Sequence, residues 1–175
     1  MLPIKKILCP TDFSEPSYEA LKAADELATH FGAALHIVNV VPVVPIVEAP
    51  IGVESASFNV ASYQQELEAQ AERSIKSLVE QKVTKGVNAV SDILIGNEAG
   101  EIVRYAQENG VDMIVIATHG RSGWRRFIAG SVTDQIVRQA TCPVLTVRPR
   151  RTRERSKDAR SLGLVLTEAP PPGKN

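Results

Sequence analysis

The stretch Asp112 to Thr133, DMIVIATHGRSGWRRFIAGSVT, decides the fold of this chain. Its beginning, Asp112 to Thr118, is an almost continuous apolar run, which is typical of a central strand buried on both faces of a parallel sheet. A glycine-rich loop from His119 to Gly130 follows, and the helical pattern after it begins near Ser131. A strand, a loop and a helix in this order predict an α/β domain whose ligands bind beyond the carboxyl ends of the strands.

Strand and helix patterns alternate along the rest of the chain. The first helical pattern has Ser14 as a suitable cap and Pro16 in its first turn, and Gly32 follows its last residue. A second, longer helical pattern ends at Gly86. This alternation predicts a mostly parallel sheet with right-handed crossovers. Its strands are expected at Ile4 to Pro10, Ala34 to Val41, Ala89 to Ile95, Asp112 to Thr118 and Pro143 to Arg148.

The segment from Pro42 to about Ala61 interrupts this alternation. It contains several prolines and is longer than most connections in a compact domain, which often indicates function or mobility. It also carries Val43, Val44 and Ile46 among other apolar residues. The segment therefore either packs on the domain or forms an unpacked insertion, and the pattern leaves both possibilities open.

Charge divides the chain into two parts. The 175 residues are neutral overall, but residues 150–175 carry seven basic and three acidic residues, a net charge of +4 that leaves −4 for residues 1–149. We expect one domain over residues 1–149 and a largely disordered tail over residues 150–175. An acidic domain argues against nucleic-acid binding, and a basic tail is more often a solvated element.

Cysteine usage and the apolar runs bear on the compartment. Cys9 and Cys142 lie in or beside apolar runs without a CxxC pattern, so we expect free, buried thiols in a reducing environment. The first residues lack the apolar region and cleavage site of a signal peptide. No apolar run approaches the roughly 20 residues needed to span a bilayer. The expectation is a cytoplasmic protein without membrane contact.

The glycine-rich loop has the composition of a phosphate site. Free backbone N–H groups and the positive end of the dipole at the helix start favour an anion there. Gly130 would admit a phosphate without a clash from Cβ, and Ser131 and Thr133 add hydroxyl groups. Arg121 raises the positive potential. Alternatively, Ser131 is only a helix cap and the glycines are only turn residues. The chain lacks both the P-loop pattern and a GxGxxG after the first strand, so a P-loop NTPase is excluded and a dinucleotide site is disfavoured.

Taken together, these segments resemble the universal stress protein family. The resemblance covers about Ile4 to Arg148 and rests on three segments: ILCPTDFS at residues 7–14, the stretch quoted above, and CPVL at residues 142–145. ATP-binding members of that family carry a small residue, two others, Gly, nine residues, and then Gly-Ser or Gly-Thr. The defined positions are occupied here by Ala117, Gly120, Gly130 and Ser131, with Ala117 where the stricter pattern has Gly.

The resemblance implies a fold and a ligand. The fold is Rossmann-like, similar to the adenine nucleotide alpha hydrolases, with five strands in the order 3-2-1-4-5 and helices on both faces. The ligand is ATP, accompanied by Mg²⁺ or Mn²⁺. Asp12 would meet ribose hydroxyls or the metal ion, unless it only caps the first helix. The residues expected around the nucleotide are Pro10, Thr11, Asp12, Val40, Ile116, Ala117, Gly120, Arg121, Gly130, Ser131, Val132 and Thr133.

The implied function is that of an ATP-binding regulatory protein of the universal stress response, with protein partners that the sequence does not identify. It would form a homodimer through the fifth strand, Pro143 to Arg148, because this strand is an exposed apolar edge in a monomer. The alternative is a slow ATPase or phosphotransfer enzyme of the same fold. Efficient phosphoryl transfer needs a positioned metal and a residue that orients the nucleophile. Asp12 is one plausible metal carboxylate, and no second partner is evident, so the regulatory function is preferred.

Overall fold

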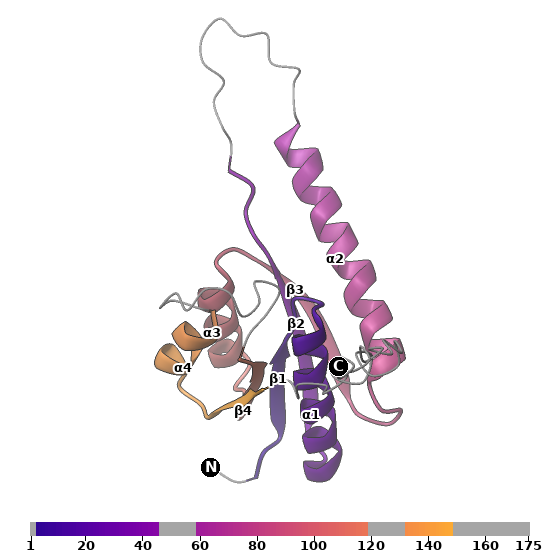
Figure 1. The fold of residues 1–175 in the computed structure, drawn as a ribbon, viewed down its shortest axis with the longest axis vertical. Coiled ribbons are helices and arrows are strands. Elements are labelled where there is room, and N and C mark those ends of the chain that lie inside the picture. The colour runs from indigo at the N-terminus through magenta and orange to yellow at the C-terminus, as the bar shows by residue number, and fades with distance from the viewer. Residues whose placement is uncertain (1–2, 46–58, 119–131, 149–175) are drawn as a thin grey trace, which may run out of the picture.

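The computed structural model describes residues 3–45, 59–118 and 132–148. Strands and helices alternate along these residues, as predicted (Figure 1). The strands are β1 (Lys6–Pro10), β2 (Ala34–Val41), β3 (Ala89–Ile95), β4 (Met113–Ala117) and β5 (Val144–Val147). The helices are α1 (Glu15–Phe31), α2 (Val60–Lys82), α3 (Glu98–Glu108) and α4 (Val132–Gln139). The tail after residue 148 and most of the segment from Pro42 to Ala61 lie outside the described residues.

The strands form one five-stranded sheet in the order β3-β2-β1-β4-β5, which confirms the predicted topology. Each of the four neighbouring pairs is parallel. The first strand in sequence is therefore the central one: Ile7 pairs with Leu35 of β2 on one side and with Met113 of β4 on the other. All strands end at the same edge of the sheet, where a ligand site is expected.

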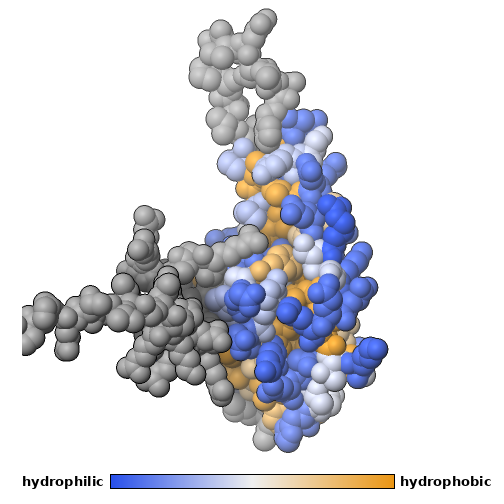
Figure 2. Space-filling view, turned by 45° about the vertical axis from the view of Figure 1, so that its right-hand side comes forward, coloured by the Kyte–Doolittle hydropathy of each residue, from blue (hydrophilic) through white to orange (hydrophobic). Residues whose placement is uncertain are grey.

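Helices cover both faces of this sheet, as predicted (Figure 1). Side chains of α1 and α2 pack with the odd-numbered residues of β1 and β2, such as Ile7 and Leu35. Side chains of α3 and α4 pack on the other face with Leu8 and Val38. Over α2, Figure 2 shows mostly hydrophilic side chains with hydrophobic ones beside them. Both faces of the central strands are consequently buried, which explains their continuous apolar sequence.

Local signals set the ends of α1. Ser14 is its N-cap and forms a capping box with Ser17, Pro16 lies in the first turn, and Gly32 closes the helix with φ 63°. The predicted start and end are confirmed. A left-handed conformation is easily adopted by glycine because it lacks Cβ.

Helix α2 ends earlier than predicted. It begins after the N-cap Asn59 and ends at Lys82, before Gly86. The reason is a tertiary contact: the buried carboxylate of Asp25 on α1 accepts hydrogen bonds from the Thr84 backbone N–H (3.0 Å) and hydroxyl (2.6 Å). These bonds turn the chain away from the helix axis two residues beyond α2.

Strands β1, β4 and β5 are each shorter than predicted by a residue or two at their ends. At the amino edge, the carboxylate of Asp112 accepts hydrogen bonds from the backbone N–H groups of Lys5 (2.7 Å) and Lys6 (2.9 Å). Asp112 thereby joins the starts of β1 and β4 through its side chain, in addition to the bond from its backbone N–H to the Lys6 carbonyl at 3.0 Å. The apolar pattern did not distinguish a paired backbone from one bonded to a side chain.

Both cysteines are free thiols, as expected. Cys9 lies in β1 and is completely buried, and this burial raises the pKa of its thiol to about 12. Cys142 is only partly buried, so the expectation of two buried thiols holds for Cys9 alone. Among the described residues, none of the helices has the length and apolar character that crossing a membrane requires.

Candidate functional site

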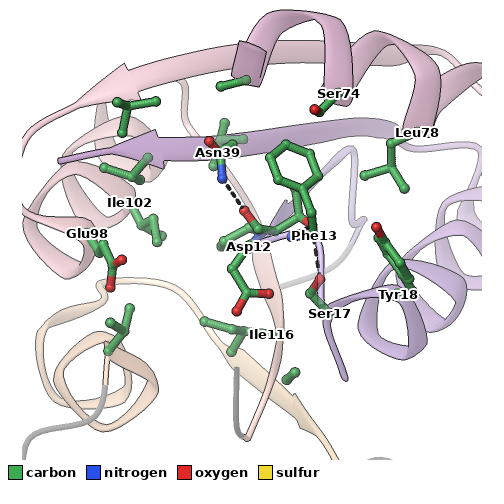
Figure 3. A pocket seen from close by; sticks show the side chains of 18 of the residues that line it. Asp12, Phe13, Ser17, Tyr18, Asn39, Ser74, Leu78, Glu98, Ile102 and Ile116 are labelled. Carbon is green, nitrogen blue, oxygen red and sulfur yellow. Dashed lines mark hydrogen bonds between the residues drawn. The ribbon is translucent and has the colours of Figure 1, made fainter. Parts of the chain in front are cut away.

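A cleft of about 1270 Å³ lies at the carboxyl ends of the strands (Figure 3). We divide its lining into two parts. The sheet end is formed where β1, β2 and β4 finish, together with residues of α3 and α4: Pro10, Thr11, Asp12, Val38, Asn39, Val40, Ile116, Ala117, Thr118, Glu98, Ile102, Val132 and Thr133. The helix end is formed by Phe13 and Tyr18 on one side and by residues of α2 from Leu67 to Lys82 on the other. Six predicted site residues are therefore brought together with Val132 and Thr133 at the sheet end.

The floor of the sheet end is apolar. Ile116 and Ala117 end β4 and are 7% and 6% exposed, and Val40 near the end of β2 is half-buried. Val132 begins α4 at the side of this floor. Such a surface suits the flat face of a nucleobase or another apolar ring.

The loop between β1 and α1 is held by hydrogen bonds from its own side chains. The buried Thr11 hydroxyl lies 3.0 Å from Ser17 Oγ and accepts a bond from the Phe13 N–H at 3.1 Å. Ser17 Oγ donates to the Ser14 carbonyl at 2.8 Å, so the hydroxyl hydrogen between Thr11 and Ser17 comes from Thr11. The Thr11 side chain consequently supports the loop from inside, although the residue lines the cleft.

Phe13 has a left-handed backbone, with φ 60°. A bulky residue in this region is uncommon and costs about 1–3 kcal/mol unless its surroundings fix it. The bonds that Thr11 and Asp12 accept from the next two backbone N–H groups supply this support. The conformation directs the Phe13 ring toward α2, between the two ends of the cleft (Figure 3).

Asp12 supports the start of α1 and also lines the cleft, so its predicted contact with a nucleotide or metal ion stays a prediction. Its Oδ1 accepts hydrogen bonds from the backbone N–H (3.1 Å) and the hydroxyl (2.5 Å) of Ser14, the N-cap of α1. Its carboxylate also points into the cleft (Figure 3). Asp12 therefore presents negative charge to a ligand from a position fixed by the start of the helix.

Asn39, Glu98 and Ile102 line the sheet end but were missed by the sequence analysis. Asn39 Nδ2 donates to the Thr11 carbonyl at 2.8 Å and so ties β2 to the loop after β1. A polar residue near the end of a buried strand was the available signal for Asn39. Glu98 and Ile102 could not be found in this way, because they approach the cleft only through the packing of α3 on the sheet.

Thr133 is bonded to the protein. Its hydroxyl donates to the carbonyl of Ala117 at 2.9 Å, which joins the first turn of α4 to the end of β4. In this arrangement the hydroxyl hydrogen is occupied, and Thr133 offers a ligand its oxygen lone pairs. The predicted residues Gly120, Arg121, Gly130 and Ser131 lie outside the described residues, so the phosphate-binding loop stays a prediction.

The charges that line the cleft differ between its two ends. In the described part of the sheet end the ionised side chains are Asp12 and Glu98, whereas Arg73 and Lys82 line the helix end. Lys82 Nζ lies 4.8 Å from the centre of the Tyr18 ring, within the range of a cation–π contact. An anionic ligand at the sheet end would therefore need positive charge from residues 119–131 or from a bound cation.

The residues present fit a metal ion only through shared coordination. The described residues contain no group of three or more His, Cys, Asp or Glu side chains that could hold a metal. Mg²⁺ usually keeps several waters and binds one or two carboxylates together with ligand phosphates. Asp12 could supply one such carboxylate, and the remaining ligands would be phosphate oxygens and water.

Comparisons with known proteins agree with this geometry. A sequence profile of the universal stress protein family matches residues 3–148. The universal stress protein MJ0531 of Methanocaldococcus jannaschii is 35% identical over 144 residues, which are 82% of each chain. The solved structure of MJ0577, a universal stress protein of the same organism, superposes with a TM-score of 0.68 at 26% identity and covers 86% of this chain and all of that one. A universal stress protein solved in complex with cAMP shares the fold at 19% identity, with a TM-score of 0.54 over 83% of this chain and 98% of its own. On the profile match and the relative at 35% identity, the chain belongs to the universal stress protein family.

Proposed function

We propose that this protein binds an adenine nucleotide, ATP, at the sheet end of the cleft and acts as a regulatory module. The observation that carries the proposal is the combination of an apolar floor and a fixed carboxylate at the carboxyl edge of a parallel sheet. In sheets of this kind ligands bind at that edge, where the strand order reverses between β1 and its two neighbours. The family relative solved with cAMP supports a nucleotide as the class of ligand.

The proposed binding mode follows from the chemistry of the lining. The adenine lies against Val40, Ile116 and Ala117, where burial of its ring is favourable. The ribose hydroxyls donate to the Asp12 carboxylate, since an acceptor of this charge repels phosphate but suits hydroxyl groups. The phosphates extend away from Asp12 and Glu98, toward the predicted loop containing Gly120, Arg121, Gly130 and Ser131. A Mg²⁺ or Mn²⁺ ion would offset the charge between the phosphates and Asp12.

The regulatory function is preferred to a slow ATPase or phosphotransfer activity. Phosphoryl transfer at a useful rate requires a residue that orients the attacking group. Two hydroxyl groups of the described sheet end, those of Thr11 and Thr133, use their hydrogens in bonds to Ser17 and to the Ala117 carbonyl, which weighs against them in this role. A phosphate-release assay should give turnover far below the roughly 10 s⁻¹ of a median enzyme. Turnover near that value would contradict the regulatory function and favour an enzyme.

The ligand itself can be identified directly. Purified protein is denatured and the released small molecule is analysed by mass spectrometry, with ATP as the expected compound. Calorimetry with ATP, cAMP, AMP and GTP then ranks the affinities, in the presence and absence of Mg²⁺. Equal affinity for GTP and ATP, or binding of none of the four, would contradict an adenine site on this floor.

A matched pair of variants tests the position of the base. Val40→Trp places a large side chain on the floor of the sheet end, and Val90→Trp makes the same change on the neighbouring strand β3, away from the cleft. We expect Val40→Trp to weaken ATP binding at least about tenfold, or 1.4 kcal/mol, and Val90→Trp to bind as the parent does. Circular dichroism checks that both variants are folded. Unchanged ATP binding by a folded Val40→Trp variant would show that the adenine does not lie against Val40.

A further inference from the structure

A buried hydrogen-bond network lies on the α3 face of the sheet and takes no part in the lining of the cleft. His36 Nδ1 of β2 is 2.9 Å from the hydroxyl of Tyr105 on α3, and this hydroxyl donates to Asp92 Oδ2 of β3 at 2.6 Å. The His36 and Tyr105 side chains are only 8% and 7% exposed, while Asp92 is exposed at the edge of the sheet. The network therefore joins three elements and connects a buried imidazole to an exposed carboxylate.

The hydrogen-bond donors in this network define the state of His36. Tyr105 gives its single hydroxyl hydrogen to Asp92, so its oxygen can only accept from His36. His36 must then carry hydrogen on Nδ1, and an additional proton can be taken up only at Nε2. In the neutral tautomer the network is complete, and a second proton adds a positive charge to a buried position.

The surroundings of His36 oppose that charge. Burial lowers the pKa of His36, and the positive charge of Lys6 on β1 lowers it further, while the negative charge of Asp92 acts in the opposite direction. Lys6 is fixed in place because its Nζ donates to the Asn109 carbonyl at the end of α3 at 2.7 Å. Within the described part of the chain, the charged and titratable groups facing His36 are thus Lys6 from β1, Asp92 from β3 and the Tyr105 phenol from α3.

The network lies next to the sheet end of the cleft, because residues close to His36 and Tyr105 in the same elements line the cleft. Val38, two residues after His36 on the same face of β2, lines the cleft, and so does Ile102, one turn before Tyr105 on α3. A movement of α3 that exposes His36 would also displace Ile102 and Glu98, which form one wall of the cleft. The position of this wall is therefore coupled to the contact between His36 and Tyr105.

We propose that His36, Tyr105 and Asp92 form a pH-sensitive latch that holds α3 against β2 and β3, and that acidification loosens α3. The consequence for ligand affinity rests on the proposed nucleotide function, because it requires the ligand to contact the wall formed by α3. The loosening itself does not depend on any ligand. The latch gives the fold a built-in response to acid.

The direction of the stability change follows from linkage. The folded state disfavours protonated His36 relative to the unfolded chain, in which histidine has a pKa of about 6.5. Below that value the unfolded chain binds more protons, so the stability contributed by neutral His36 is complete above about pH 6.5 and is lost as the pH falls. The opposite sign would require a raised pKa in the folded protein.

Urea unfolding between about pH 7.5 and 5.5 tests the latch, because histidine is the side chain whose ordinary pKa lies in this interval. His36→Asn is the variant: its amide can still donate to Tyr105 near the position of Nδ1 but cannot titrate. The controls are the same change at the other two histidines of the chain: His30→Asn, at an exposed position, and His119→Asn. Acidification should raise the equilibrium constant for unfolding of the parent and of the controls. We expect this rise to be at least about threefold larger than the rise for His36→Asn. Equal acid dependence in His36→Asn and the parent would overturn the proposal.

Two measurements on the parent protein keep the proposal testable if His36→Asn does not fold. Nitrogen NMR of the imidazole should show hydrogen on Nδ1 at neutral pH, and hydrogen on Nε2 alone would contradict the network. Backbone hydrogen exchange, corrected for the intrinsic effect of pH, should show a greater loss of protection in α3 than in α1 at about pH 5.5. Equal losses in the two helices would overturn the assignment to α3. Because none of these measurements uses a nucleotide, they can fail or succeed independently of the proposed function.

Discussion

The sheet has two edges, and they differ in length and in charge. β3 is the edge beside β2, with the sequence AVSDILI and the exposed carboxylate of Asp92 at its centre. β5 is the edge beside β4, with the sequence VLTV and no charged residue, and its Leu145 is 41% exposed. Unpaired edges invite association with another chain, and an inward or central charge is one way to prevent it. The comparison indicates that β3 is protected from pairing, whereas β5 is suited to it.

The backbone groups available for pairing can be assigned on both edges. The carbonyls of Pro143 and Val147 accept hydrogen bonds from β4, so the intervening N–H and C=O groups of Thr146 point away from the sheet. On β3, the carbonyl of Asn88 and the N–H of Gly96 bond to β2, which leaves the groups of Ser91 pointing outward. We propose that the protein forms a homodimer in which the β5 edges of two copies pair about a twofold axis.

The largest expected effect comes from proline at Thr146, the outward position on β5. Thr146→Pro removes an N–H that would pair across the dimer and leaves the bonds to β4 intact. We expect light scattering to show that Thr146→Pro is a monomer at micromolar concentration and that the parent is a dimer. Ser91→Pro is the matched control on β3 and should remain a dimer. If Ser91→Pro dissociates the dimer and Thr146→Pro does not, the pairing edge has been assigned to the wrong strand.

A smaller effect is expected where β3 is fixed to α3. Tyr105→Phe removes the hydroxyl between His36 and Asp92 and keeps the ring, so we expect a loss of about 1–2 kcal/mol in the free energy of unfolding. Burial and the hydrogen bond to Asp92 raise the pKa of Tyr105, which shows that its protonated form is the one the fold stabilises. Tyr18→Phe is the control, because the ring of Tyr18 contacts Lys82 while its hydroxyl makes no hydrogen bond to any of the residues that the structure describes. Chemical denaturation of both variants at pH 7.5 measures the difference. An equal loss in the two variants would contradict the prediction that the network stabilises the contact between β3 and α3.

A weaker contrast is expected between the central and edge strands in thiol chemistry. Burial raises the pKa of Cys9 to about 12, and burial also raises that of Cys142, which precedes β5. Because the thiolate is the reactive form, both thiols should react more slowly than free cysteine at about pH 8. With a thiol reagent, Cys142 should react first in the native protein, and Cys9 only after unfolding. Reaction of Cys9 in the folded protein would show that β1 opens locally.

The smallest effect is expected beyond β5. From their composition, we expect residues 150–175 to bury too little apolar surface to offset the entropy of ordering. Truncation after Arg151 should leave the melting temperature nearly unchanged and should leave the protein in the same oligomeric state as the parent. A fall of more than several degrees would show that Leu162 to Leu166 packs on the domain.

The fold was predictable because its determinants are local and repeated. The apolar run before His119, the Ser14 cap and Gly32 each define an element without knowledge of the rest of the molecule. The end of α2 was not predictable, because it depends on the contact of Thr84 with Asp25, far away in the sequence. The same holds for the starts of β1 and β4, which Asp112 joins through its side chain.

The candidate site was predictable where strands end and unpredictable where helices approach. Asp12, Val40, Ile116 and Ala117 were expected from the family resemblance and lie at or just beyond strand ends, and the structure brings them to one cleft. Glu98 and the helix end of the cleft depend on how α3 and α2 pack. The side-chain bonds of Thr11 and Thr133 were also beyond the sequence pattern, since a hydroxyl near a ligand site can equally well serve the backbone.

The central position of β1 has a consequence for how the chain folds during its synthesis. β1 leaves the ribosome first and can pair with β2 at once, but its other partner, β4, begins at Met113. Until then, Ile7 and Leu8 in a nascent β1-β2-β3 sheet present an open apolar edge, the kind of surface on which chaperones act and misfolding starts. Pairing over such a sequence distance also slows folding in general. We expect refolding to pass through an intermediate in which β1, β2 and β3 are protected from hydrogen exchange before β4 and β5.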